Sequence, residues 1–263
     1  MDVVGQGGLG VVYVAQDSLL HRPVALKFLR DEHRENAEIR ERFFHEVIHT
    51  SQLNHPNIVT IHDYGVYEEQ PYILMEFLDG CTLDELLLKH APFDTDNFRG
   101  LASQLLDAIS MAHKIGLFHG DIKPLNVKVQ HLEGGYPQLK LFDFGLSRIL
   151  HRDLKQVVES DGTVEGTLIY MAPEQFLGQS IDGRTDLYSI GAIFYELLSG
   201  KAPFEADTTE QWIEKIVHEA PIPLRQRNSK ISEEVEQVIL KMMAKHPEDR
   251  YRDGVAVAAA LGL

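Results

Sequence analysis

Four polar side chains stand close together in two short stretches of the chain. Asp121, Lys123 and Asn126 lie in HGDIKPLNV, and Asp143 follows an apolar run in LFDFG. Moving a phosphoryl group requires mainly positioning and charge neutralisation. A carboxylate such as Asp121 can orient the attacking hydroxyl, and Lys123 can lie against the phosphate. Asn126 and Asp143 offer the hard oxygen ligands that suit Mg²⁺.

These two stretches resemble the catalytic loop HRDxKxxN and the metal-binding DFG of the eukaryotic-type (Hanks-type) protein kinases. The resemblance implies that Asp121, Lys123 and Asn126 are catalytic. It also implies that Asn126 and Asp143 bind Mg²⁺, or Mn²⁺ in its place, and that Asp143 contacts the ATP complex.

The glycines near the start of the chain support the same family. Gly5, Gly7 and Gly10 interrupt an alternating apolar pattern, which predicts strand, glycine turn and strand. A Rossmann fold would need a helix after these glycines, and a P-loop would need Lys followed by Ser or Thr. The kinase pattern needs a valine two residues after the third glycine, and Val12 is there.

The resemblance extends the nucleotide site into the following strands. Lys27 ends VALK within the apolar run 24–29 and matches the lysine that holds the ATP phosphates. The other positions that correspond to the family's nucleotide site are Ala25, Met75 as gatekeeper, Glu76, Leu78 and Lys128.

A helix predicted from about 37 to 53 carries Glu46, which the resemblance pairs with Lys27. The same helix contains a competing motif, because His45, Glu46 and His49 spell HEVIH and match the zinc-protease pattern HExxH. No second zinc-protease element stands out downstream. A zinc hydrolase is therefore kept only as a minor alternative.

The resemblance implies a bilobal α+β fold, and the segment pattern agrees with it. Apolar runs at 58–61 and 72–77 complete a five-stranded antiparallel sheet with one helix, and a mainly helical lobe follows from residue 83, including a long helix within 92–116. We expect one protein kinase domain over 1–263, with an N-lobe at 1–77, a hinge at 78–81 and a C-lobe at 82–263. Both ends look short for the family, so we expect the domain to be clipped there.

Later motifs complete the resemblance, which covers essentially the whole chain. GTLIYMAPE matches the family's substrate-binding segment, and Thr167 together with Lys123 is the Ser/Thr form. Asp186 resembles the buried aspartate that holds the catalytic loop. Glu174 and Arg250 resemble an ion pair that ties the segment to the helical lobe. The sequences of these motifs are similar to those of bacterial Ser/Thr protein kinases.

Composition agrees with this interpretation. The chain has 263 residues, 44% hydrophobic and 25% charged, with one cysteine and a formal charge of −15. One cysteine excludes an internal disulfide framework, and the acidic balance argues against nucleic acid as a partner. No apolar run is long enough to span a membrane. We expect a cytoplasmic protein with a protein substrate that offers Ser or Thr; no pattern specifies an oligomeric state.

Two departures from the family pattern affect the prediction. Gly120 replaces an arginine that in relatives pairs with a phosphate, so we expect activity to depend little on phosphorylation of Ser160 or Thr163. Lys128 replaces an apolar residue beneath the adenine; its stem could cover the base with its charge in water, or it could weaken ATP binding. We therefore predict a Ser/Thr protein kinase, with an ATP-binding pseudokinase scaffold as the main alternative.

Overall fold

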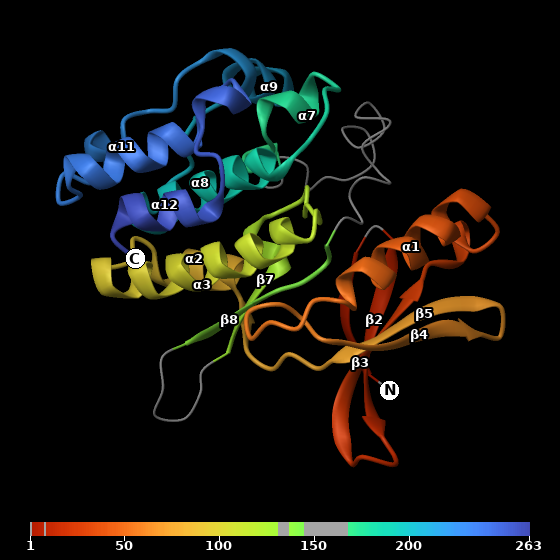
Figure 1. Ribbon diagram of the computed structural model, residues 1–263. Coiled ribbons are helices and arrows are strands. Elements are labelled where there is room, and N and C mark those ends of the chain that lie inside the picture. The colour runs from red at the N-terminus through yellow and green to blue at the C-terminus, as the bar shows by residue number, and fades with distance from the viewer. Residues whose placement is uncertain (1, 8, 131–136, 145–167) are drawn as a thin grey trace.

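The computed structural model describes residues 2–7, 9–130, 137–144 and 168–263 (Figure 1). The first part forms an antiparallel sheet in the order β1-β2-β3-β5-β4, and the rest forms a mainly helical lobe. The strands of this sheet are β1 (Asp2–Gln6), β2 (Gly10–Asp17), β3 (Arg22–Leu29), β4 (Ile61–Tyr67) and β5 (Gln70–Glu76). This is the bilobal α+β architecture that the sequence predicted.

One face of the sheet packs against its single long helix, α1 (Ala37–Thr50). Alternate residues of β3 and β5 are buried, as expected for strands with one covered face. Phe43 and Val47 of α1 join Leu29 and Ile73 in a small hydrophobic core. A short 3-10 helix, η1 (Asp31–His33), connects β3 to α1.

The strand expected at 58–61 is wrong in position, because β4 begins at Ile61. Ile58 instead forms an isolated parallel bridge with Leu141 of the helical lobe. Val59 N donates to Leu141 O, and Leu141 N donates to Asn57 O, each at 2.9 Å. Ile58 and Val59 therefore find their backbone partner in the other lobe, whereas Thr60 and Ile61 pair with β5 of the five-stranded sheet.

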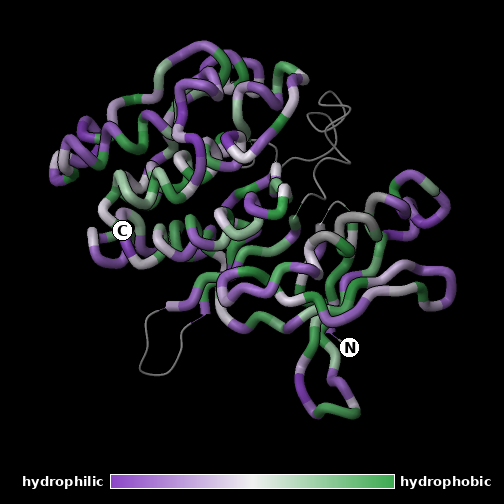
Figure 2. The backbone as a smooth tube through the Cα atoms, viewed as in Figure 1, coloured by the Kyte–Doolittle hydropathy of each residue, from purple (hydrophilic) through white to green (hydrophobic). Residues whose placement is uncertain are grey.

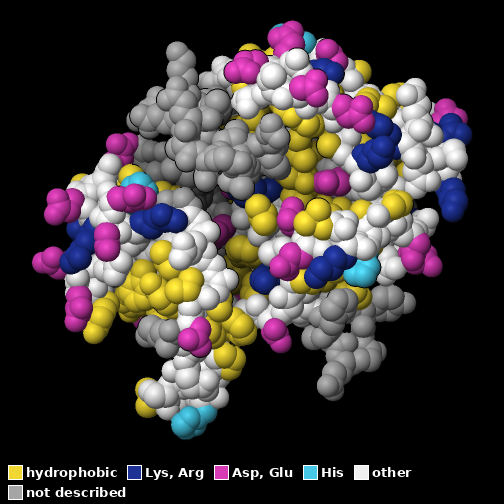
Figure 3. Space-filling view, turned by 180° about the vertical axis from the view of Figure 1, so that it is seen from behind, with side chains coloured by type: hydrophobic (Ala, Val, Ile, Leu, Met, Phe, Trp, Pro, Cys, Tyr) yellow, Lys and Arg dark blue, Asp and Glu magenta, His cyan; other side chains and the backbone are white. Residues whose placement is uncertain are grey.

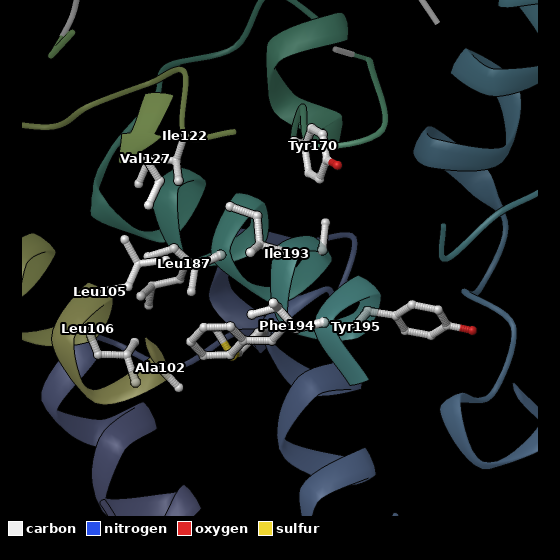
Figure 4. Close-up of a cluster of buried hydrophobic side chains, with 14 of the residues drawn as sticks. Ala102, Leu105, Leu106, Ile122, Val127, Tyr170, Leu187, Ile193, Phe194 and Tyr195 are labelled. Atoms are coloured by element: carbon white, nitrogen blue, oxygen red, sulfur yellow. The ribbon is translucent and has the colours of Figure 1, made fainter. Parts of the chain in front are cut away.

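The helical lobe is built around α8 (Gly183–Ser199), nearly all of which is buried. Figure 4 shows its side chains Leu187, Ile193 and Phe194 facing those of α3 (Thr95–Lys114). Ile122, between Asp121 and Lys123, and Val127, directly after Asn126, point into the same cluster and are 1% and 0% exposed. The core thus holds the segment that carries the predicted catalytic residues at two points.

The other helices cover this core, and polar and apolar residues alternate along them (Figure 2). Asp94 caps the long helix by accepting from Asn97 N at 2.8 Å, so that helix begins at Thr95 rather than at 92. The described helices of this lobe are α2 (Leu83–His90), α3 (Thr95–Lys114), η2 (Pro124–Asn126), α7 (Pro173–Phe176), α9 (Thr209–His218), α10 (Leu224–Arg227), α11 (Glu233–Met242), η4 (Pro247–Asp249) and α12 (Gly254–Leu261).

A small sheet joins the two lobes. Its strands lie in the order β6 (Cys81–Thr82), β7 (Val127–Gln130) and β8 (Gln138–Leu141), all antiparallel.

Acidic side chains are scattered over both lobes on the face shown in Figure 3. Within the described ranges, no helix combines the length and the apolar character needed to cross a bilayer.

Candidate active site

The catalytic loop brings Asp121, Lys123 and Asn126 into direct contact. Lys123 Nζ lies 2.9 Å from Asp121 Oδ2. Asn126 Nδ2 donates to the backbone O of Asp121 at 2.9 Å and to Oδ2 at 3.2 Å. The carboxylate is therefore held by a cation and by an amide, in a fixed orientation and about four-fifths buried.

Asp186, near the start of α8, holds the catalytic loop through hydrogen bonds to its backbone. Its carboxylate is 0% exposed and accepts from the backbone N–H groups of His119 at 2.9 Å and Gly120 at 2.7 Å. His113 Nε2 lies 2.8 Å from the same carboxylate. These bonds satisfy a carboxylate whose burial would otherwise be costly. Asp186 thus holds the catalytic loop, as the family resemblance implied.

Lys27 and Asp143 meet across the two lobes. Lys27 Nζ donates to Asp143 Oδ1 at 2.6 Å, and the whole Lys27 residue is 5% exposed. Asp143 adopts φ 61°, a left-handed conformation that is uncommon outside glycine. The surrounding contacts must therefore stabilise this backbone geometry and aim the carboxylate.

Two predictions on α1 concern side chains outside the described residues. These are the pairing of Glu46 with Lys27 and the zinc motif formed by His45, Glu46 and His49. The backbone of α1 is described and places all three on one helix. Both interpretations of their side chains stay predictions.

The predicted glycine loop connects β1 to β2. Gly7 N donates to Gly10 O at 2.9 Å, which closes the turn. A Cβ on Gly10 would lie 2.7 Å from the backbone O of Phe28 and 3.2 Å from Lys27 Cγ, so only glycine fits at this position. Val12 pairs with Lys27 across β2 and β3, which places the valine beside the lysine.

Ala25 and Met75, both predicted at the nucleotide site, pair across β3 and β5 and pack with Val59. Val12, Leu78 and Phe142 are packed against this cluster. It forms an apolar surface at the junction of the lobes, as a purine ring requires.

Glu76, two residues before the predicted hinge, is anchored to β8. Glu76 Oε1 accepts from Lys140 Nζ at 2.6 Å and from Thr60 N at 2.7 Å. Glu76 N in turn donates to Thr60 O at 3.0 Å. The sequence did not single out Lys140, because its role depends on a partner 64 residues away.

The Lys128 ammonium group donates a hydrogen bond to a backbone carbonyl. Its Nζ donates to Gly80 O at 3.0 Å, at the exit of the predicted hinge. A Cβ on Gly80 would lie 2.3 Å from the backbone O of Val129, so this glycine lets the hinge backbone lie directly on β7. This solvent-exposed contact ties the hinge exit to β7, and the effect of Lys128 on ATP binding stays a prediction.

The segment 168–176 is fixed to the helical lobe by a buried ion pair. Arg250 Nη1 and Nη2 donate to Glu174 Oε1 and Oε2, both at 2.7 Å, and the side chains are 0% and 1% exposed. This pair is the one expected from the sequence. Thr167, which belongs to the same predicted motif, lies outside the described residues.

Tyr170 adds a second anchor for this segment. Its hydroxyl donates to Glu196 Oε2 at 2.5 Å, and burial raises the pKa of the Glu196 carboxyl.

Gln175, the residue after Glu174, also bonds to the catalytic loop, and sequence reasoning did not single it out. The only available indication was its place directly after APE.

Comparisons with known proteins agree with this geometry. The family model described as "Protein kinase domain" matches residues 1–258. The chain is 35% identical over 264 residues to serine/threonine-protein kinase PknB of Mycobacterium leprae, covering 99% of this chain and 42% of that protein. It is 34% identical to PknB of Mycobacterium tuberculosis, covering 99% and 41%. The chain thus spans about two fifths of the length of these relatives.

Solved structures show the same fold. The crystal structure of the Mycobacterium tuberculosis PknI kinase domain matches with a TM-score of 0.75 at 25% identity, over 99% of this chain and 93% of that one. Together with the family model, this confirms the predicted fold class and family, which uses ATP and a divalent metal ion to phosphorylate proteins. The chain belongs to the protein kinase domain family.

Proposed function

We propose that this chain transfers the γ-phosphate of ATP to serine or threonine hydroxyls of a protein substrate. The observation that carries the proposal is the contact among Asp121, Lys123 and Asn126, within one lobe, together with the Lys27–Asp143 pair that joins this lobe to the sheet. These groups supply positioning and charge neutralisation, which are the main demands of phosphoryl transfer.

Each of the candidate site residues then has a definite task. Asp121 orients the acceptor hydroxyl and takes its proton, and Lys123 lies beside the transferred phosphate. Lys27 binds the phosphates under the glycine loop of Gly5, Gly7 and Gly10. The apolar cluster of Ala25, Val59 and Met75 packs on the adenine.

The metal-binding role of Asn126 and Asp143 fits their chemistry. Asn126 uses its amide nitrogen on Asp121, which leaves its carbonyl oxygen as a ligand. Asp143 contributes a carboxylate, and such oxygen ligands suit Mg²⁺ or Mn²⁺. When bound, the metal–ATP complex supplies the phosphoryl group with its charge partly neutralised.

The test is transfer of labelled phosphate from ATP and Mg²⁺ to a generic basic protein. We expect incorporation by the wild-type chain and at least about a hundredfold less by Asp121→Asn, which keeps the shape but removes the base. Equal incorporation by both would show that the activity belongs to a contaminant and would contradict the proposal.

An ATP-binding scaffold is the second candidate, and Lys128 motivates it because it places a charged side chain where the family has an apolar one. A folded protein that binds ATP in calorimetry but transfers no phosphate would support this scaffold and rule out the kinase.

A further inference from the structure

The peptide bond that leads into Asp121 has both of its polar groups held by side chains. Gly120 adopts φ 73°, and its N–H donates to Asp186 Oδ1 at 2.7 Å. The C=O of Gly120 accepts from Gln175 Nε2 at 2.9 Å in a buried contact. The N–H of the same peptide unit belongs to Asp121 and donates to His119 Nδ1 at 3.2 Å.

Because a peptide unit is planar, fixing its C=O and its N–H fixes the direction in which the chain enters Asp121. The carboxylate of Asp121 is one short side chain away from this plane. A rotation of the plane would therefore move the carboxylate with it.

Gln175 is suited to hold this carbonyl and cannot be reversed. Its side-chain Oε1 accepts from Ala172 N at 2.9 Å, and a backbone N–H can only donate. Gly120 O can only accept, so the amide orientation is assigned from both ends. Gln175 is 9% exposed, and the neighbouring Glu174 is fixed by Arg250, so the amide is anchored to the helical lobe.

The bonds continue to the residue before Asp143. His119 Nδ1 accepts from Asp121 N, which places the proton of a neutral imidazole on Nε2. His119 Nε2 lies 3.0 Å from Phe142 O, which it then donates to. Donors therefore point in one direction, from Ala172 through Gln175, the Gly120–Asp121 peptide and His119 to Phe142. Such chains strengthen each bond by polarisation.

We propose that Gln175 is a positioning residue for the transfer reaction. It joins segment 168–176 to the catalytic loop through Gly120 O, and so sets the orientation of Asp121. The inference rests on the proposed function for its kinetic consequence, but the contact itself does not. The link contains no charged group among its partners, so it needs no phosphate to form.

Gln175→Glu is the sharpest test, because it keeps the length and the oxygen that accepts from Ala172 N but removes the donor to Gly120 O. Gln175→Met removes both bonds without adding a charge and serves if the glutamate variant fails to fold. Gln179→Glu is the matched control: the same chemical change at an exposed position four residues along the chain.

We expect both Gln175 variants to lower kcat about tenfold, the usual worth of one buried hydrogen bond, with KM for ATP within about twofold of wild type. Hydrogen exchange at residues 119–122 should be faster, and Gln179→Glu should match wild type in all three readouts. An unchanged kcat, or unchanged exchange at 119–122, in a folded Gln175 variant would overturn the inference.

The two proposals fail in different ways. A wild-type chain that transfers no phosphate refutes the proposed function, whereas the exchange measurement still decides whether Gln175 holds the catalytic loop.

Discussion

Lys27 Nζ and Asp143 Oδ1 lie 2.6 Å apart. This ion pair connects β3 of the sheet to the helical lobe, where Asp143 lies two residues after the end of β8. The Lys27 side chain is 6% exposed, whereas that of Asp143 is 31% exposed. The buried Lys27 ammonium depends strongly on its counter-charge, whereas the partly exposed Asp143 carboxylate can also reach a ligand.

Replacing Lys27 by Met should reduce kcat/KM for ATP by about a hundredfold or more, because a preorganised cation at the phosphates is lost. Steady-state kinetics at several ATP concentrations provides the measurement. The control is Lys114→Met, which removes an exposed lysine at the end of α3. A Lys27→Met enzyme within threefold of wild type would contradict the assigned role.

The Glu174–Arg250 pair should stabilise the fold only while both partners are present. Arg250→Leu leaves the Glu174 carboxylate buried without its partner and should lower the free energy of unfolding by about 3–5 kcal/mol. The double variant Glu174→Leu with Arg250→Leu should lose less than the sum of the single changes. Urea unfolding measures all three, and Arg184→Ala, in the exposed pair with Asp182, should cost less than about 1 kcal/mol.

Lys128→Leu should bind ATP about threefold more tightly, because an apolar side chain replaces a polar one beneath the base and each buried methylene contributes about 0.8 kcal/mol. Titration calorimetry with ATP and Mg²⁺ measures this, with the exposed Lys89→Leu as the control. Unchanged affinity would show that Lys128 does not weaken ATP binding. Weaker binding would show that its contact with Gly80 O supports the hinge.

Thr163→Ala should retain activity within about twofold of wild type, and Ser160→Ala likewise, because Gly120 has no side chain to pair with a phosphate. Phosphate transfer to a generic substrate, before and after phosphatase treatment, provides the measurement. Both residues lie outside the described part of the chain, so this expectation rests on the sequence and on Gly120. A large loss in Thr163→Ala would refute it.

Local motifs made much of the site predictable. Asp121, Lys123 and Asn126 lie within six residues, so their mutual contact follows from one turn of the loop. Glu174 and Arg250 are 76 residues apart, and only the family resemblance suggested that they meet. Family patterns thus supplied the long-range pairings that spacing alone could not.

Other features depend on tertiary contacts that no local pattern specifies. The run 58–61 has the composition of a strand, but Ile58 and Val59 pair with β8 and only the end of the run pairs with β5, a division that the local pattern does not indicate. Gln175 reaches Gly120 over 55 residues, and Lys128 donates to the carbonyl of Gly80, 48 residues away. In each case the tertiary fold brings the two partners together.

The backbone bonds between 57–59 and β8 attach residues 57–59 to the helical lobe, to which Asp143 also belongs, whereas Lys27 belongs to the sheet. Any movement of one lobe against the other would therefore change the separation of Lys27 Nζ and Asp143 Oδ1. Labels placed on the two lobes would report opening of the domain even in a variant that transfers no phosphate.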